Sequence, residues 1–127
     1  MENIHIEGSV RTPYVHFDAN SGRLEVAGRS IPENSITFYK PLFDWLDSYM
    51  ETPKEETTMV FNLEYFNTAS SKCILDLLRK LEQLKEKHGS KLVKVKWMFD
   101  EGDEDMEESG GDFKSLINLD IELIEKG

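Results

Sequence analysis

The sequence predicts an α/β fold in which helices pack on a mixed β-sheet. Three patterns support this prediction: two segments of alternating polarity on either side of a turn, one long amphipathic helix, and a short apolar segment on each side of that helix. The chain of 127 residues has the size of one domain, 1–127, and no linker-like segment divides it. Its hydrophobic content of 39% is enough for a core without a metal ion or a disulfide.

The chain begins with a predicted β-hairpin. Residues 14–17 and 23–26 alternate in polarity, and residues 18–22 between them are turn formers. Gly28 is expected to end the second strand. The N-terminal part of the sheet is therefore expected to be antiparallel.

A helix is predicted over residues 35–50, where apolar side chains recur at spacings of three and four. Residues 30–34 introduce it, and Pro32 suits a helix entry because proline has no N–H to leave unpaired there. Pro41 lies inside the pattern and removes one helical hydrogen bond. We therefore expect a kink or two short helices at that point.

A βαβ unit forms the predicted centre of the sheet. Residues 57–63 form a short, mostly apolar segment, as expected of a buried central strand. In residues 91–99, apolar side chains alternate with lysines. Between them a row of leucines marks one face of a helix over residues 69–88, which Gly89 ends. The two strands are expected to be parallel.

The C-terminal quarter carries nearly all of the net charge. Residues 100–127 hold 11 acidic and 2 basic side chains, a balance of −9, whereas the whole chain has −10. Such a charge repels nucleic acid and anionic membrane surfaces, so neither is an expected partner. Protein partners with basic surfaces are left open.

Seven acidic residues lie within residues 100–108, which raises the hypothesis of a calcium loop. Counted from Asp103, however, the sixth loop position is Glu108 and not the required glycine. A solvated acidic turn or helix start is the preferred interpretation. Gly110 and Gly111 are then expected to break the chain, before a short helical segment near residues 113–117 and a closing strand over residues 119–123.

Targeting signals and reactive clusters are not evident. The N-terminus lacks the basic and apolar regions of a signal peptide, and no apolar run reaches 18 residues, so a cytoplasmic protein is expected. Cys73 is single and is expected just off the buried helix face. His5, His16 and His88 lack the spacing of a zinc site. We predict no metal and no cofactor.

The candidate functional site is the turn that opens the long helix. Four small hydrogen-bonding side chains crowd it, namely Asn67, Thr68, Ser70 and Ser71. A helix N-terminus has unpaired amides and a partial charge of about +0.5, so it stabilises an anion, including a phosphate attached to a hydroxyl. The same residue types are the preferred N-caps, and capping by Asn67 or Thr68 alone would also explain the cluster.

Several motifs occur in an order that matches a known family. They are Thr12-Pro13, the segment 28–34 (GRSIPEN), Phe38-Tyr39, Pro41-Leu42, Trp45-Leu46, the segment 65–72 (YFNTASSK) and Lys96-Trp97 before the acidic segment. Together they span nearly the whole chain and resemble the SiaC family of regulatory phosphoproteins. The order of elements is also similar to the STAS or anti-sigma-factor-antagonist fold, which implies a STAS-like domain.

The resemblance implies a switch protein that is not an enzyme. The phosphorylated threonine of the family falls on Thr68. A GHKL-type protein kinase would phosphorylate it and a metal-dependent PPM-type phosphatase would reverse the reaction. The unphosphorylated form would bind and activate a GGDEF-type diguanylate cyclase, which raises cyclic di-GMP and favours biofilm formation.

The expected partner-binding residues are Asn67, Thr68, Ser70, Ser71 and Lys72. A partner packed over this turn could not tolerate a phosphate on Thr68, because it would have to desolvate the charge without a matching cation. Lys72, one turn further along the helix, is either a partial counter-charge for the phosphate or an ordinary solvated lysine.

Two other functions are considered. The first is a STAS-like module that senses a small ligand or acts as an anti-anti-sigma-type binding protein. The second is an enzyme with Ser70, Ser71 or Cys73 as nucleophile, which would need a base within hydrogen-bond reach. The sequence supplies only distant histidines for that role.

Overall fold

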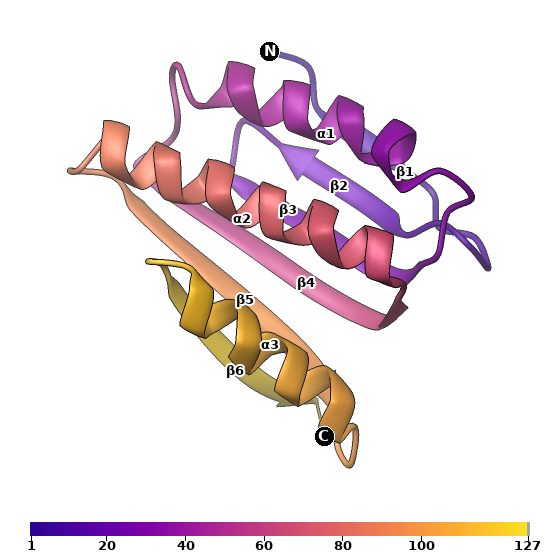
Figure 1. Ribbon diagram of the computed structural model, residues 1–127. Helices are drawn as coiled ribbons and strands as arrows, with labels where there is room; N and C mark the ends of the chain where they lie inside the picture. Colours follow the sequence, from indigo (N-terminus) through magenta and orange to yellow (C-terminus); the bar gives the residue numbers. More distant parts are fainter. Residues whose placement is uncertain (127) are drawn as a thin grey trace.

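A six-stranded mixed sheet, with its strands in sequence order, forms the base of the molecule (Figure 1). The computed structural model describes residues 1–126, so that Gly127, the last residue of the predicted domain, lies outside the described part. The strands are β1 (Ile4–Ile6), β2 (Tyr14–Asp18), β3 (Arg23–Ser30), β4 (Glu56–Phe66), β5 (Leu92–Asp100) and β6 (Asp120–Lys126). Strands β1 to β3 pair antiparallel, and β3 to β6 pair parallel. The predicted α/β class and N-terminal hairpin are confirmed.

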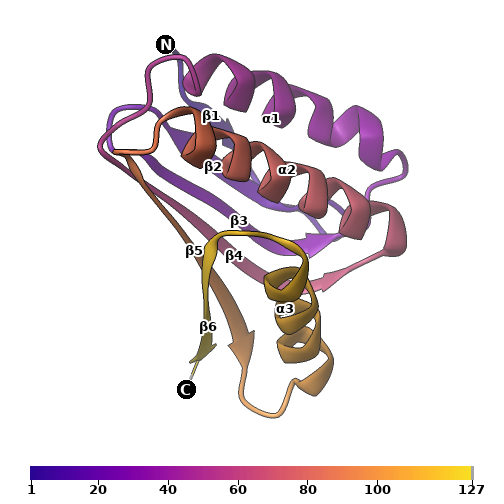
Figure 2. The ribbon, with the colours of Figure 1, turned by 60° about the vertical axis from the view of Figure 1, so that its left-hand side comes forward.

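Three helices connect the parallel strands and lie on one face of the sheet (Figures 1 and 2). They are α1 (Ser35–Tyr49), α2 (Thr68–Lys87) and α3 (Glu104–Leu116). Consecutive parallel strands are neighbours in the sheet, so connections of one hand all pass over the same face. The predicted βαβ unit is β4, α2 and β5. On the uncovered face, Lys94 is exposed and Lys96 half-buried, as the lysine alternation predicted.

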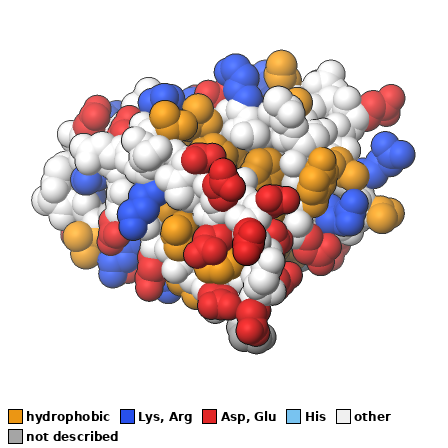
Figure 3. Space-filling model, turned by 60° about the horizontal axis from the view of Figure 1, so that its bottom comes forward, with side chains coloured by type: hydrophobic (Ala, Val, Ile, Leu, Met, Phe, Trp, Pro, Cys, Tyr) orange, Lys and Arg blue, Asp and Glu red, His pale blue; other side chains and the backbone are white. Residues whose placement is uncertain are grey.

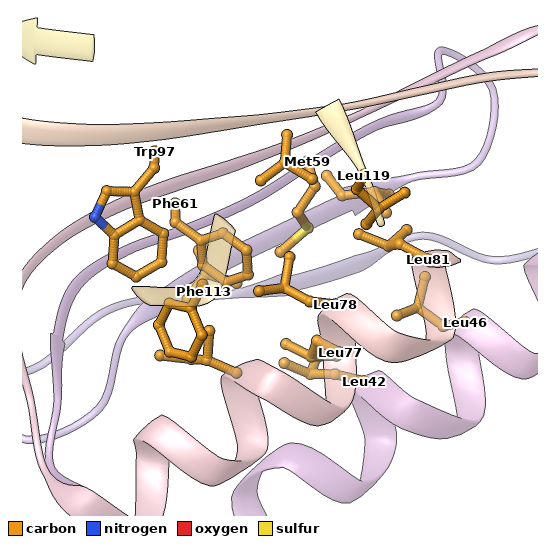
Figure 4. Packing of buried hydrophobic residues seen from close by; sticks show 14 of the residues in the cluster. Leu42, Leu46, Met59, Phe61, Leu77, Leu78, Leu81, Trp97, Phe113 and Leu119 are labelled. Carbon is orange, nitrogen blue, oxygen red and sulfur yellow. The ribbon is translucent and has the colours of Figure 1, made fainter. Parts of the chain in front are cut away.

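The hydrophobic core lies between the sheet and the helices. Leu77, Leu78 and Leu81 of α2 are fully buried. Leu78 points toward Met59 and Phe61 of β4, and Leu77 lies beside Leu42 of α1 (Figure 4). Fully burying one leucine side chain contributes about 2 kcal/mol. The leucine face of α2 is therefore a large contribution to the stability of the fold, and its burial fixes α2 on the sheet.

The end of β3 differs from the prediction. Gly28 does not end the strand: it has a φ of +94°, and the pairing with β4 shifts register directly after it. Glu64 of β4 is left without a partner residue on β3, which makes it a β-bulge. The bulge changes which side chains face the helices. Phe66 packs against the core, and Tyr65 is 52% exposed.

Helix α1 continues through Pro41 as one helix, so that of the two expected alternatives, a kink or two short helices, the second is wrong. Tyr39 and Leu42, on both sides of the proline, are fully buried, and this burial holds both halves of the helix on the sheet. The side chain of Asn34 caps α1. Pro32 lies in the loop that leads into the cap, within the segment that was expected to introduce the helix.

The paired glycines do not break the chain, because Gly110 and Gly111 both lie inside α3. A Cβ atom added to Gly110 would lie 2.7 Å from Nε1 of Trp97 and 2.7 Å from Cδ2 of Leu123. Gly110 is therefore where the helix comes closest to the sheet. The acidic helix start is confirmed, with Asp103 as the N-cap of α3.

The N-terminal strand β1 was not predicted. It has three residues and pairs with β2, with Ile4 opposite Phe17. A strand of this length shows too little alternation for a sequence pattern to reveal it. None of the helices within residues 1–126 has the length and apolar character needed to cross a bilayer.

Candidate functional site

Thr68 is the first residue of α2, and its neighbour Asn67 holds it there. The Asn67 side chain accepts a hydrogen bond from the amide of Ser70 at 2.8 Å, so Asn67 is the N-cap. The amide of Asn67 donates to the carbonyl oxygen of Ser30 at 3.1 Å, which joins the turn to the end of β3. Thr68 itself is exposed, and its side chain is not needed as the cap.

The start of α2 can stabilise an anion on the Thr68 side chain. The first hydrogen bond inside the helix runs from the amide of Ser71 to the carbonyl of Asn67. The amides of Thr68 and Ala69 precede it, so they are free to donate to an anion or to water. The first turn holds no acidic residue, so a negative charge at this end meets the positive end of the helix dipole.

Ser70 has a structural role, as part of a buried hydrogen-bond network. Its side chain is fully buried, and its hydroxyl donates to the carbonyl of Ser30 at 2.9 Å. The Ser30 hydroxyl donates to it at 2.9 Å, and the Ser35 hydroxyl lies 3.3 Å away. This buried network joins the starts of α1 and α2 to the end of β3. The structure does not support the predicted surface role of Ser70.

Tyr39 completes the same network. Its hydroxyl lies 2.7 Å from the hydroxyl of Ser30. Burial raises the pKa of Tyr39 to about 12, although its hydrogen bond with Ser30 acts in the opposite direction. The phenol therefore stays protonated, and it can donate to Ser30 at neutral pH.

Thr68 lies at an open groove of about 340 Å³ between α2 and α3. Of the five predicted partner-binding residues, Thr68, Ser71 and Lys72 line this groove, whereas Asn67 and Ser70 do not. Its apolar lining comes from Phe66, Leu75, Phe113 and Leu116, and its other polar lining from Ser109 and Asp112. Four of the nine lining residues, all from α3, lie more than 30 positions away from Thr68 in the sequence.

The ammonium group of Lys72 can pair with negatively charged groups on the outer face of α2. Its ammonium lies 3.4 Å from the carboxylate of Asp76, and its side chain is 78% exposed. Residues four apart share a helix face, so Lys72 lies on the same face as Thr68. An exposed pair of this kind contributes little to stability and can exchange partners.

A second, smaller hollow continues the groove toward the start of α3. It measures about 190 Å³ and shares Phe66 and Ser109 with the first. Its remaining lining comprises Glu64, Tyr65, Asp103, Asp105 and Met106. Figure 3 looks at the molecule from the side of α3 and β6 and shows acidic side chains gathered there, with hydrophobic side chains between and beside them.

Cys73 lies deeper than the sequence suggested. It was expected just off the buried face and is only 3% exposed, because α2 packs on both the sheet and α1. Burial raises the pKa of its thiol, and the carboxylate of Asp76 raises it further, whereas Lys72 lowers it. A protonated thiol is a poor nucleophile. A nucleophilic role for Cys73 or for the buried Ser70 therefore loses support.

The histidines and acidic residues do not form a metal site among residues 1–126. His5 contacts Glu7 at 3.1 Å, and His88 contacts the carbonyl of Met50 at 2.6 Å. His88 is the C-cap of α2, at the opposite end of the helix from Ser71, and His5 lies on the edge strand β1. Neither supplies a base for Ser71.

Sequence reasoning missed the part of the site that α3 contributes. Phe113 and Leu116 were assigned to a short helical segment with no functional role. The available signal was the amphipathic spacing that continues from Met106 to Phe113, which places one face of α3 against the sheet. No sequence pattern indicated that this helix would leave a gap beside α2.

The chain matches proteins of one family over almost its full length. The family model described as SiaC family regulatory phosphoprotein matches residues 6–126. An uncharacterised protein of Pseudomonas aeruginosa strain UCBPP-PA14 is 31% identical over 114 residues, which cover 90% of this chain and 89% of that protein.

Solved structures from Pseudomonas aeruginosa show the same fold. The crystal structure of apo-SiaC has a TM-score of 0.88 and 27% identity, with 98% of this chain and 99% of that chain covered. The crystal structure of the diguanylate cyclase SiaD in complex with its activator SiaC contains a chain with a TM-score of 0.89 and 28% identity. There, 97% of this chain and 99% of that chain are covered.

Proposed function

Because the chain belongs to the SiaC family of regulatory phosphoproteins, we propose that it is a binding protein gated by phosphorylation of Thr68. Its unphosphorylated form binds and activates a GGDEF-type diguanylate cyclase in the cytoplasm, which raises cyclic di-GMP and favours biofilm formation. A GHKL-type kinase adds the phosphate and a PPM-type phosphatase removes it. The protein acts without a cofactor or catalysis of its own.

The observation that carries this proposal is the exposed threonine at the start of α2, beside an apolar groove. A kinase can reach the Thr68 hydroxyl without unfolding the helix. The related SiaC, which has the same fold, is the activator of the diguanylate cyclase SiaD. We prefer this function to small-ligand sensing because the groove is open and borders the phosphorylation candidate.

A phosphate on Thr68 would change the charge of the groove and leave the fold intact. It adds about −1.5 to −2 charges at neutral pH, next to free helix amides that accommodate them. Lys72 is the nearest cation in the lining and would exchange Asp76 for the phosphate. Asp112, in the same lining, would repel it.

The switch acts on the partner through desolvation. An apolar side chain of the cyclase that fills the groove must displace water from Phe66, Leu75 and Leu116. A phosphate at the rim would have to lose its hydration in the same step, at a cost larger than one Lys72 contact restores. Phosphorylation therefore weakens binding by local charge.

The site is tested by co-expression with the cognate kinase and measurement of intact mass. The parent should gain one phosphate, about 80 Da. Thr68→Ala should show no gain, whereas Ser71→Ala, which changes a neighbouring hydroxyl in the same groove, should gain the phosphate normally. An equal mass gain in Thr68→Ala and the parent rejects Thr68 as the site.

The gating mechanism is tested with a matched pair of substitutions. Thr68→Asp adds a charge and should lose cyclase binding, whereas the similarly sized Thr68→Asn should keep most of it. Both should unfold at nearly the parent temperature, because Thr68 is exposed. Equal cyclase affinity of the two variants would show that charge does not control binding.

A further inference from the structure

We propose that the groove selects a protein segment that carries apolar anchors together with lysine or arginine, and that acidic side chains of α3 recognise those cations. The inference deepens the proposed function and rests on it for the identity of the partner. It adds the chemistry that the partner must present, and it assigns this recognition to a part of the chain far from Thr68.

The apolar part of the surface is the end of the groove beside Thr68. Phe66, Leu75 and Phe113 line its wall, and Leu116 stands at its rim with 56% of its surface exposed. Tyr65, at the rim of the adjoining hollow, is 52% exposed. Exposed large side chains beside a groove are typical of protein contact sites. The bulge at Glu64 produces this arrangement, because it exposes Tyr65 and directs Phe66 to the core side of the sheet.

The charged part of the surface is α3 and the turn before it. Residues 101–112 contain seven acidic side chains and no lysine or arginine. They are Glu101, Asp103, Glu104, Asp105, Glu107, Glu108 and Asp112. None of them belongs to an ion pair within the described chain.

The two acidic residues of α1 are arranged differently. On α1, Asp44 pairs with Lys40 at 2.9 Å and Asp47 pairs with Lys80 of α2 at 2.7 Å. Lysines of the same chain therefore neutralise those two charges. The acidic side chains of α3 have no such partner, so their negative potential can attract a cationic molecule outside the chain.

Helix capping explains part of the acidic run but not all of it. Asp103 caps α3 by accepting from the amide of Met106 at 3.1 Å, and carboxylates in the first turn complement the helix dipole. The dipole effect fades after the first turn. Glu108 and Asp112 lie beyond that turn, and both are exposed. They repel their neighbours unless a cation approaches.

The two parts form one continuous surface. The larger hollow, with Thr68, and the smaller one, with Asp103 and Asp105, share Phe66 and Ser109. A bound segment would place its apolar anchor beside Thr68 and its cations over α3. The phosphate then obstructs the anchor, while the acidic end selects the partner by charge and speeds its association.

Two labelled model peptides test the charge preference on the unphosphorylated full chain. They share the same leucine spacing, and one carries lysine where the other carries glutamate. Fluorescence anisotropy should show the lysine peptide binding at least about tenfold more tightly at about 50 mM salt, with a smaller difference at about 300 mM. Equal affinities would overturn the inference.

Matched variants locate the effect. A triple variant that neutralises three acidic side chains of α3 should remove the charge preference; it carries Asp105→Asn, Glu108→Gln and Asp112→Asn. A control triple variant removes three acidic charges from β6 and should keep the preference; it carries Asp120→Asn, Glu122→Gln and Glu125→Gln. Leu116→Ser should weaken both peptides alike. The inference fails if both triple variants lose the preference equally, or if Leu116→Ser changes nothing while the chain stays folded by circular dichroism.

Binding of the cyclase, measured in parallel, separates this inference from the proposed function. If the cyclase binds the parent but neither peptide is preferred, the charge recognition is wrong and the switch function stands. If the lysine peptide is preferred and the cyclase does not bind, the proposed partner is wrong and the chemistry of the groove stands.

Discussion

Helix α2 has two neighbours on the same face of the sheet, and it meets them in different ways. Toward α1 the helices close-pack, with buried leucines such as Leu42 and Leu77 between them (Figure 4). Lys87 of α2 also reaches Glu51, just after α1, at 3.1 Å. Toward α3 the first turns of α2 leave the groove of about 340 Å³.

This difference shows which side of α2 can bind a partner. The α1–α2 contact fixes α2, and with it the position of Thr68, on a rigid base. The α2–α3 gap leaves apolar side chains uncovered without exposing the core. A charge added at Thr68 therefore changes the gap and leaves the close-packed contact unaffected, as a switch that keeps its fold requires.

The largest expected effect on stability compares a leucine on the close-packed face of α2 with a leucine in the groove. Leu77→Ala should lower the free energy of unfolding by about 3 kcal/mol, because Leu77 is fully buried and its loss leaves a cavity. Leu75→Ala removes the same atoms from a half-buried residue that lines the groove, so it should cost less than about 1 kcal/mol and weaken cyclase binding instead. Urea unfolding and binding assays check both. Equal stability losses would break the comparison.

The next effect concerns how closely α3 approaches the sheet. Gly110→Ala should lower the free energy of unfolding by about 2 kcal/mol, because the new methyl group would contact Trp97 and Leu123. Gly111→Ala has open space around its Cβ position and should raise stability by up to about 1 kcal/mol through helix propensity. Thermal unfolding of the two variants measures the contrast. A stabilised Gly110→Ala would mean that α3 is not pressed on the sheet there.

The smallest effect tests the buried network under α1 and α2. Tyr39 has a pKa of about 12 when folded and about 10 when unfolded, so the unfolded chain loses this proton first. The stability that this group contributes is complete below about pH 10 and is lost as the pH rises toward 12, by about 1 kcal/mol at pH 11. Tyr39→Phe should lack this component between pH 8 and 11 in urea unfolding. Identical pH profiles would show that the phenol is not buried as described.

Most elements follow from local patterns that the sequence displays. The hairpin, the leucine face of α2 and the alternating strand β5 were predicted because their apolar periods are long enough to distinguish helix from strand. Thr68 was selected because hydroxyl and amide side chains cluster after a buried strand, together with the resemblance to a phosphoprotein family. The periodicity and the hydroxyl cluster need only neighbouring residues, whereas the resemblance rests on motifs along nearly the whole chain.

The expectations that failed depend on contacts between distant residues. Ser70 and Thr68 are both small hydroxyl residues of one helical turn, and only the packing of β3 and α1 on one side of that turn buries Ser70 and leaves Thr68 exposed. Gly110 and Gly111 have the composition of a chain break, yet the close contact with Trp97 makes a glycine favourable inside the helix. A local pattern contains no information on either contact.

The sequence by itself determined the hairpin, the succession of elements from α1 to β5, the acidic character of the last quarter and the hydroxyl-rich turn, because periodicity, charge and capping act over a few residues. The tertiary structure decided which hydroxyl is reachable, which leucines remain uncovered and that the acidic helix borders the groove beside Thr68. Those features depend on the distance between α2 and α3, which the side chains packed beneath both helices set jointly. The groove therefore became visible only when residues 66–75 and 109–116 were brought together in space.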